Sequence, residues 1–220
     1  MSTRDPFGTR DHEGHGQRSA VAELWWIPVG AGGHLVIHTS RWWERWRAVR
    51  ERRAARPLFH AALEIHDGGR RTVIEMAPAW GRGSGSAGVV ATGPVGMRPL
   101  GALRLFRYEI RCRDDGVLPD RSHAPDPPRR LPLTDHMART IPDRLRTVPL
   151  HTWGRDAVGV GDMWNSNSLV AWLLEISGLD TSDLHPPADG AAPGWAAGVA
   201  AAGTRAAVVS RGKGAGGEDR

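Results

Sequence analysis

The sequence is poor in residues that cross-link a chain or carry it through a membrane. Its single cysteine, Cys112, excludes an internal disulfide and a metal cluster held by thiolates. No apolar run approaches the roughly 20 residues that a transmembrane helix needs, so we expect no membrane-spanning segment. The polar residues 1–20 carry no secretory signal, and together with the lone cysteine they predict a cytoplasmic protein.

Lysine is also scarce: Lys213 is the only lysine among 29 Lys+Arg residues. The formal net charge is +5 and the pI is near 10.7, which permits contact with nucleic acid or an anionic surface. The high pKa of arginine inflates this pI, however. Positive charge alone is therefore a weak argument for such a partner.

Hydrophobic residues make up 40% of the 220 residues and charged residues 24%, which is typical of one globular domain with a core. Composition divides the chain into a disordered leader at 1–20, a domain at 21–195 and a low-complexity tail at 196–220. We expect both ends to be removable without unfolding the domain, because they offer few large apolar groups to bury.

Hydrophobic periodicity predicts an α+β domain with a mainly antiparallel sheet packed against a buried helix. The clearest hairpin joins strands at 58–66 and 71–77 through the Gly68-Gly69 turn. Further strands are predicted at 24–29, 34–39 and 103–111, helices at 40–55, at 134–146 and from the caps at 165–168 to Gly178, a Gly/Ser-rich loop at 78–99, and a linker at 114–130.

The hairpin places acid–base side chains on one face of the sheet. With this turn Ala62 faces Glu75, and His60 lies diagonally across from Glu75. A carboxylate beside an imidazole orients the ring and raises its basicity, which suits a general base. The same face can instead be a solvated charged surface, or bind a metal ion through His60, Glu64, His66 and Glu75. Since the chain has no HExxH pair and no cysteine ligand set, we predict no metal.

Polar residues also mark the start of the most apolar helix: Asn165, Ser166, Asn167 and Ser168. A nucleophile at a helix N-terminus gains from the positive end of the helix dipole and from free backbone N–H groups. The alternative is capping alone, because Ser and Asn are favoured N-cap residues.

Two segments occur in the order seen in circularly permuted papain-like domains. The first is the strand from Phe59 to Ile65, with His60 near its start, and the second is the later segment Asn165 to Leu169. The chain thereby resembles the NlpC/P60-like group, which includes the lecithin:retinol acyltransferase type. It is also similar to an uncharacterised bacterial family of about this length with no established activity. Four segments carry that likeness: the HxALE strand at His60, GPVG at 93–96, WGRD at 153–156 and MWNSNS at 163–168.

The resemblance implies a permuted papain-like fold and a hydrolase or acyltransferase that acts on an amide, ester or thioester of a small molecule or peptide. Ser166 would be the nucleophile, in place of the cysteine of the enzymatic members, and His60 its base. Glu75 would orient His60, and backbone N–H groups around Asn167 would stabilise the oxyanion. No cofactor is implied. The alternative is a non-catalytic binding module on the same scaffold.

The helix predicted near residues 41–53 offers a candidate surface for that alternative. Trp42, Trp46 and Val49 form an apolar stripe, and arginines occupy the rest of the helix. Such a helix can contact RNA, DNA or an anionic membrane surface, or it can pack its tryptophans on the sheet and leave the arginines in water. We expect the structural role, and no nucleic-acid partner.

Overall fold

The computed structural model of the chain describes residues 20–30, 52, 54–80, 88–118, 120–187 and 189–214. Three predicted segments lie outside the described residues: the leader up to residue 19, the strand at 34–39 and, apart from Arg52, the arginine- and tryptophan-rich helix near 41–53. Within the described part of the chain, no helix combines the length and the apolar character that crossing a membrane requires.

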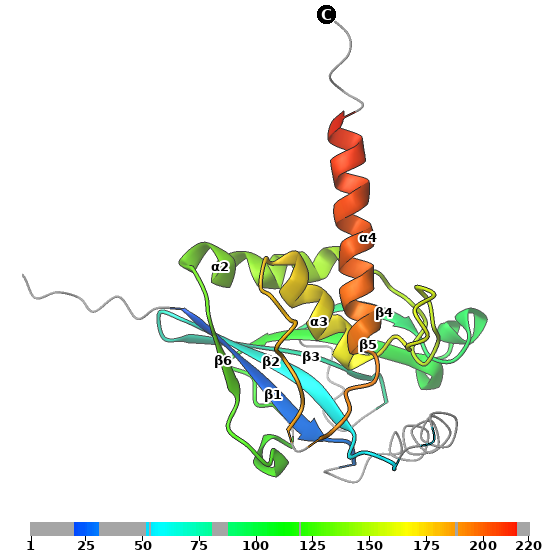
Figure 1. Cartoon of the computed structure of the whole chain (residues 1–220), viewed down its shortest axis with the longest axis horizontal. Coiled ribbons are helices and arrows are strands. Elements are labelled where there is room, and N and C mark those ends of the chain that lie inside the picture. Colours follow the sequence, from blue (N-terminus) through cyan, green and yellow to red (C-terminus); the bar gives the residue numbers. More distant parts are fainter. Residues whose placement is uncertain are drawn as a thin grey trace, which may run out of the picture.

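Six strands pair antiparallel in the order β4-β5-β3-β2-β1-β6 (Figure 1). This sheet confirms the predicted α+β class. The strands are β1 Val21–Pro28, β2 Phe59–Asp67, β3 Arg70–Pro78, β4 Val89–Pro94, β5 Arg107–Asp114 and β6 Arg129–Pro132.

The helices α2, α3 and α4 lie on one side of the sheet (Figure 1). Thr134 caps α2 by accepting the N–H of Met137 at 3.2 Å, and α3 ends before Gly178, as predicted. The helices are α2 Asp135–Arg144, α3 Ser166–Ile176 and α4 Trp195–Gly214, with 3-10 turns η1 Arg98–Ala102, η2 Arg104–Phe106, η3 Arg121–His123 and η4 Leu145–Thr147.

The main hydrophobic core lies between the sheet and these helices. Alternate residues of β2 enter it, because strand side chains point in turn to the two faces. They are Phe59, Ala61, Leu63 and Ile65, which share this core with the apolar residues of α3. A smaller core covers the opposite face and contains Trp25, Ile27, Ala62, Val73 and Leu118.

The β2–β3 hairpin has the predicted register, since Glu64 pairs with Val73 and His66 with Arg71. The pairing ends at Leu63 and Ile74, so Ala62 and Glu75, which were predicted to face each other next, are not paired. Beyond that point β3 continues only along β5.

Two stretches differ from the prediction. The predicted loop at 78–99 contains β4, an edge strand whose Gly and Pro residues hide its pattern. The strand predicted from residue 103 begins at Arg107, because η1 and η2 precede it. Leu103 and Leu105, which suggested strand alternation, are 57% and 61% exposed.

The segment that composition marks as a tail begins with a packed helix. Ala197, Ala201 and Ala202 of α4 are buried. A Cβ built on Gly198 would lie 2.3 Å from the carbonyl oxygen of Ser168, so α3 and α4 approach closely at this glycine. Small residues have little apolar surface each, but they allow two helix backbones to pack against one another.

Candidate functional site

The predicted site begins at the N-terminus of α3. Asn165 is the N-cap, and its Oδ1 accepts the N–H groups of Asn167 at 2.9 Å and Ser168 at 3.4 Å. In return, the Ser168 Oγ accepts the Asn165 N–H at 3.0 Å. This capping box satisfies donors that would otherwise be free at the helix start. The Asn167 N–H is therefore already bonded and is not open to an oxyanion.

The side chain of Asn167 joins α3 to the beginning of β2. Its Oδ1 accepts the Ala61 N–H at 2.6 Å, and its Nδ2 donates to the carbonyl oxygens of Phe59 at 3.0 Å and Pro193 at 2.8 Å. Asn167 is buried, and every donor of its amide has a partner. A buried polar group bonded in this way holds the elements around it in one arrangement.

Among the described residues, no hydrogen bond joins His60 to Ser166, so their pairing stays a prediction. Ser166 is buried at the first position of α3, and no hydrogen bond joins its hydroxyl to another described residue. His60 lies between Phe59 and Ala61, whose side chains face the core under α3. Strand alternation therefore turns His60 to the opposite face of the sheet.

Glu75 is engaged by arginines and forms no ion pair with His60. Its Oε1 binds Arg113 through Nη2 and lies 3.8 Å from Nη1 of Arg111. Burial raises the pKa of Glu75, against the opposing effect of Arg113 and Arg111. The Glu75 carboxylate, which was predicted to orient His60, therefore interacts with two arginines instead.

Three of the four segments that carry the family resemblance lie side by side next to the start of α3. The Trp153 N–H donates to the carbonyl oxygen of Pro94 at 2.9 Å, and the Gly96 N–H donates to that of Trp153 at 3.0 Å. On its other side the WGRD segment meets MWNSNS, because the Gly154 N–H donates to the Trp164 carbonyl oxygen at 2.9 Å. Hydrogen bonds between backbones thus bring together stretches that are far apart in sequence.

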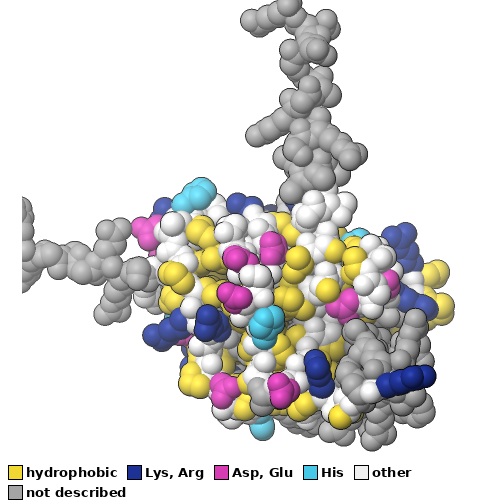
Figure 2. Space-filling model, in the orientation of Figure 1, with side chains coloured by type: hydrophobic (Ala, Val, Ile, Leu, Met, Phe, Trp, Pro, Cys, Tyr) yellow, Lys and Arg dark blue, Asp and Glu magenta, His cyan; other side chains and the backbone are white. Residues whose placement is uncertain are grey.

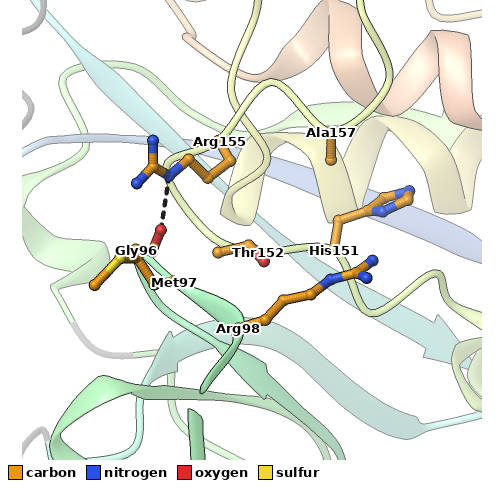
Figure 3. Close-up of a pocket in the computed structure, with 7 residues that line it drawn as sticks. All are labelled: Gly96, Met97, Arg98, His151, Thr152, Arg155 and Ala157. Atoms are coloured by element: carbon orange, nitrogen blue, oxygen red, sulfur yellow. Dashed lines mark hydrogen bonds between the residues drawn. The ribbon is translucent and has the colours of Figure 1, made fainter. Parts of the chain in front are cut away.

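Two of these segments, GPVG and WGRD, border an open pocket of about 400 Å³ (Figure 3). Arg155 lies on one side of it, Arg98 and the His151 ring lie on the other, and Thr152 lies between them. Arg155 is held in place because its Nε donates to the Gly96 carbonyl oxygen at 2.7 Å. The lining residues are Gly96, Met97, Arg98, His151, Thr152, Arg155 and Ala157.

The positive charge of this pocket is not neutralised from within the described residues, where neither Arg98 nor Arg155 pairs with a carboxylate. Asp156 follows Arg155 in sequence but folds back on its own loop. Its carboxylate accepts the N–H groups of Gly161 at 2.8 Å and Gly159 at 2.8 Å, and these bonds lower its pKa. Asp156 therefore does not compete for the arginines.

His151 is the titratable group of the pocket. Burial, and then the charge of Arg98, lower its pKa below the usual 6.5. The ring packs edge-on against Trp164, with 4.9 Å between ring centroids. The His151 carbonyl oxygen accepts the Tyr108 hydroxyl at 2.9 Å, and burial raises the pKa of Tyr108 to about 12. The tyrosine therefore stays a hydrogen-bond donor, and it fixes the backbone at His151.

Sequence reasoning did not identify this pocket. Arg155 belongs to the WGRD segment, which was noted only for its likeness to a family, and Arg98 and His151 lie in stretches without a periodic pattern. The available signal was weak: a histidine and two arginines beside Gly-containing turns. Only the pairing of Trp153 with Val95 and with Trp164 brings them together.

Comparison with known proteins adds no relative from which a role could be read. No family model, no curated protein and no solved structure matches this chain, so the resemblance to permuted papain-like domains stays a prediction.

Proposed function

We propose that this protein is a binding module for a small molecule or peptide that carries an anionic group, held in the pocket between Arg98 and Arg155. The observation that carries the proposal is that two arginines, Arg98 and Arg155, line one pocket and neither pairs with a carboxylate among the described residues. Guanidinium groups bind carboxylates and phosphates through two parallel N–H bonds, which fixes both position and orientation. Thr152 adds a hydroxyl between them.

The surroundings of the pocket suit a ligand with an apolar part. Met97 lines the pocket and is 51% exposed, and Leu103 and Leu105 of the adjoining η1–η2 stretch are also exposed. Figure 2 shows basic and hydrophobic side chains gathered at the end of the molecule where β4 and β5 lie. Apolar groups exposed beside a charged cavity are typical of binding surfaces.

The hydrolase or acyltransferase hypothesis stays a prediction, as do the papain-like topology and the cytoplasmic location. Its catalytic pair would be His60 and Ser166, and strand alternation places His60 on the face of β2 opposite the core under α3. Cys112 does not replace Ser166 as a nucleophile, because burial raises the pKa of its thiol. A binding role does not require a nucleophile paired with a base.

Titration of the full chain with inorganic phosphate, and separately with citrate, at constant ionic strength tests the proposal. NMR of the histidine side chains should show a saturable shift of His151. Arg98→Gln should raise the Kd by about five- to tenfold, which corresponds to about 1–1.4 kcal/mol. Arg155→Gln should weaken binding too, although it also removes the contact with Gly96.

Arg129→Gln is the matched control, because Arg129 is an exposed arginine of β6 at the other edge of the sheet. It should leave the Kd unchanged. If Arg129→Gln weakens binding as much as the two pocket variants do, the anions respond only to net charge and the pocket is not the site. If His151 shows no saturable shift with either anion, the proposed function is wrong.

A further inference from the structure

A second cluster of chemically active side chains lies on the face of the sheet opposite the helices. Glu23 of β1 and Glu64 of β2 are direct cross-strand neighbours, and His66 follows two positions after Glu64 on the same face. The Nε2 of His66 lies 3.3 Å from Oε2 of Glu23 and 3.7 Å from Oε2 of Glu64. β3 and β5 separate these strands from β4 and the arginine pocket.

We propose that Glu23, Glu64 and His66 bind a divalent transition metal ion, with Zn²⁺ as the best fit. One ligand atom from each residue lies within 4.8 Å of the other two. Ligands at about 2.1 Å from a tetrahedral ion are separated by about 3.4 Å, close to the two spacings above. Two carboxylates and one imidazole are ligands that Zn²⁺ accepts, with a fourth position left open.

Two unsatisfied atoms in this cluster point to a missing cation. Glu64 is fully buried, and its Oε1 has no hydrogen-bond partner. The Nε2 of His66 is likewise buried without a hydrogen bond. A buried carboxylate oxygen without a partner is costly, and two glutamates directly opposite one another repel. A metal ion that Glu64 binds through both carboxylate oxygens removes both penalties at once.

The neighbouring arginines do not already supply that cation. Arg130 binds Oε1 of Glu23 with Nε at 3.0 Å and Nη2 at 2.9 Å, which leaves Oε2 turned to His66. Arg121 reaches only Oε2 of Glu64, at 3.3 Å. Their side chains are 74% and 44% exposed, so water screens both charges. The two arginines therefore leave Oε2 of Glu23 facing His66 and Oε1 of Glu64 without a partner.

A proton on His66 is the competing explanation. At 3.3 Å the protonated ring would serve mainly Glu23, and the Oε1 of Glu64 would remain without a partner. A metal ion contacts all three side chains.

Calorimetric titration of the full chain with ZnCl₂, repeated with MgCl₂, tests the proposal. We expect saturable Zn²⁺ binding that raises the thermal unfolding midpoint and that Mg²⁺ does not displace, because Mg²⁺ prefers six oxygen ligands. His66→Gln and Glu23→Gln should weaken Zn²⁺ binding by at least the roughly 10–100-fold that follows loss of an outer-shell partner. The visible spectrum of the Co²⁺-loaded chain should report four-coordination and change in His66→Gln.

His136→Gln is the control, because His136 is exposed on α2 and belongs to no such cluster. Glu64→Gln changes a fully buried residue, so His66→Gln carries the test if that variant fails to fold. The proposal is overturned if the wild-type chain binds no Zn²⁺ saturably, if His66→Gln binds it unchanged, or if His136→Gln weakens it equally. Equal competition by Mg²⁺ would also overturn it, since the cluster would then attract any cation.

Discussion

Asn167 bonds to the backbone of Ala61 across 106 positions of sequence, with 2.6 Å between Oδ1 and the amide nitrogen. β3 stops pairing with β2 at Leu63, so the earlier backbone groups of β2 have no strand on this side. The Asn167 amide takes that place, accepting from Ala61 and donating to Phe59. Buried backbone groups need a partner, and here a side chain at the start of α3 provides it.

Asn167→Asp should destabilise the protein by about 3–5 kcal/mol. The carboxylate keeps the acceptor for Ala61 but has no N–H for the carbonyl oxygens of Phe59 and Pro193, which are left buried and facing a negative charge. Urea denaturation followed by tryptophan fluorescence measures the loss. A change below about 1 kcal/mol would contradict this role for Asn167.

Ser166→Ala and Ser168→Ala separate capping from catalysis. The Ser168 hydroxyl accepts from Asn165 at 3.0 Å and lies 2.7 Å from the Gly194 carbonyl oxygen, so its loss should cost about 1–3 kcal/mol. Ser166→Ala should stay within about 0.5 kcal/mol of the wild type. A fluorophosphonate probe should label neither serine. Labelling at Ser166, abolished in His60→Ala, would favour the hydrolase hypothesis instead.

Gly198→Ala and Gly203→Ala test whether α4 is part of the folded domain. A Cβ at Gly198 would lie 2.3 Å from the Ser168 carbonyl oxygen, so this variant should lose about 1–3 kcal/mol. At Gly203 nothing lies within 4 Å, and alanine should be neutral or stabilise the helix by up to about 1 kcal/mol. Equal denaturation midpoints would mean that the chain after residue 195 can be removed, as its composition predicts.

Arg98→Gln should raise the pKa of His151, because it removes one of the two causes that lower it. In the wild type the unfolded chain takes up the proton first, so stability falls as the pH drops below about 6.5 through the folded pKa. The variant should lose less stability over this range. Bound phosphate acts in the same direction on the ring, so the pKa of His151 should be higher with phosphate than without it. NMR titration of His151 with and without phosphate measures both effects, and an unchanged pKa in Arg98→Gln would contradict the coupling.

Local sequence signals were sufficient where neighbouring residues determine the structure. Gly68 and Gly69, both with positive φ, set the hairpin turn and hence the register of Glu64 with Val73. The Asn and Ser residues before the apolar run of α3 located its N-terminus, because they cap it with their own side chains. The α+β class follows from these elements.

The tertiary structure decided the roles of the polar residues, since those roles depend on partners far away in the chain. Spacing could not reveal that β2 pairs with β3 only from Leu63 onward. The unpaired residues before Leu63 bond to Asn167 instead, and Glu75 binds the arginines of β5. Nor could spacing place Glu23 opposite Glu64, or Arg98 beside His151. A period of two assigns a side chain to a face of a strand, but only the order of strands in the sheet determines which residues share that face.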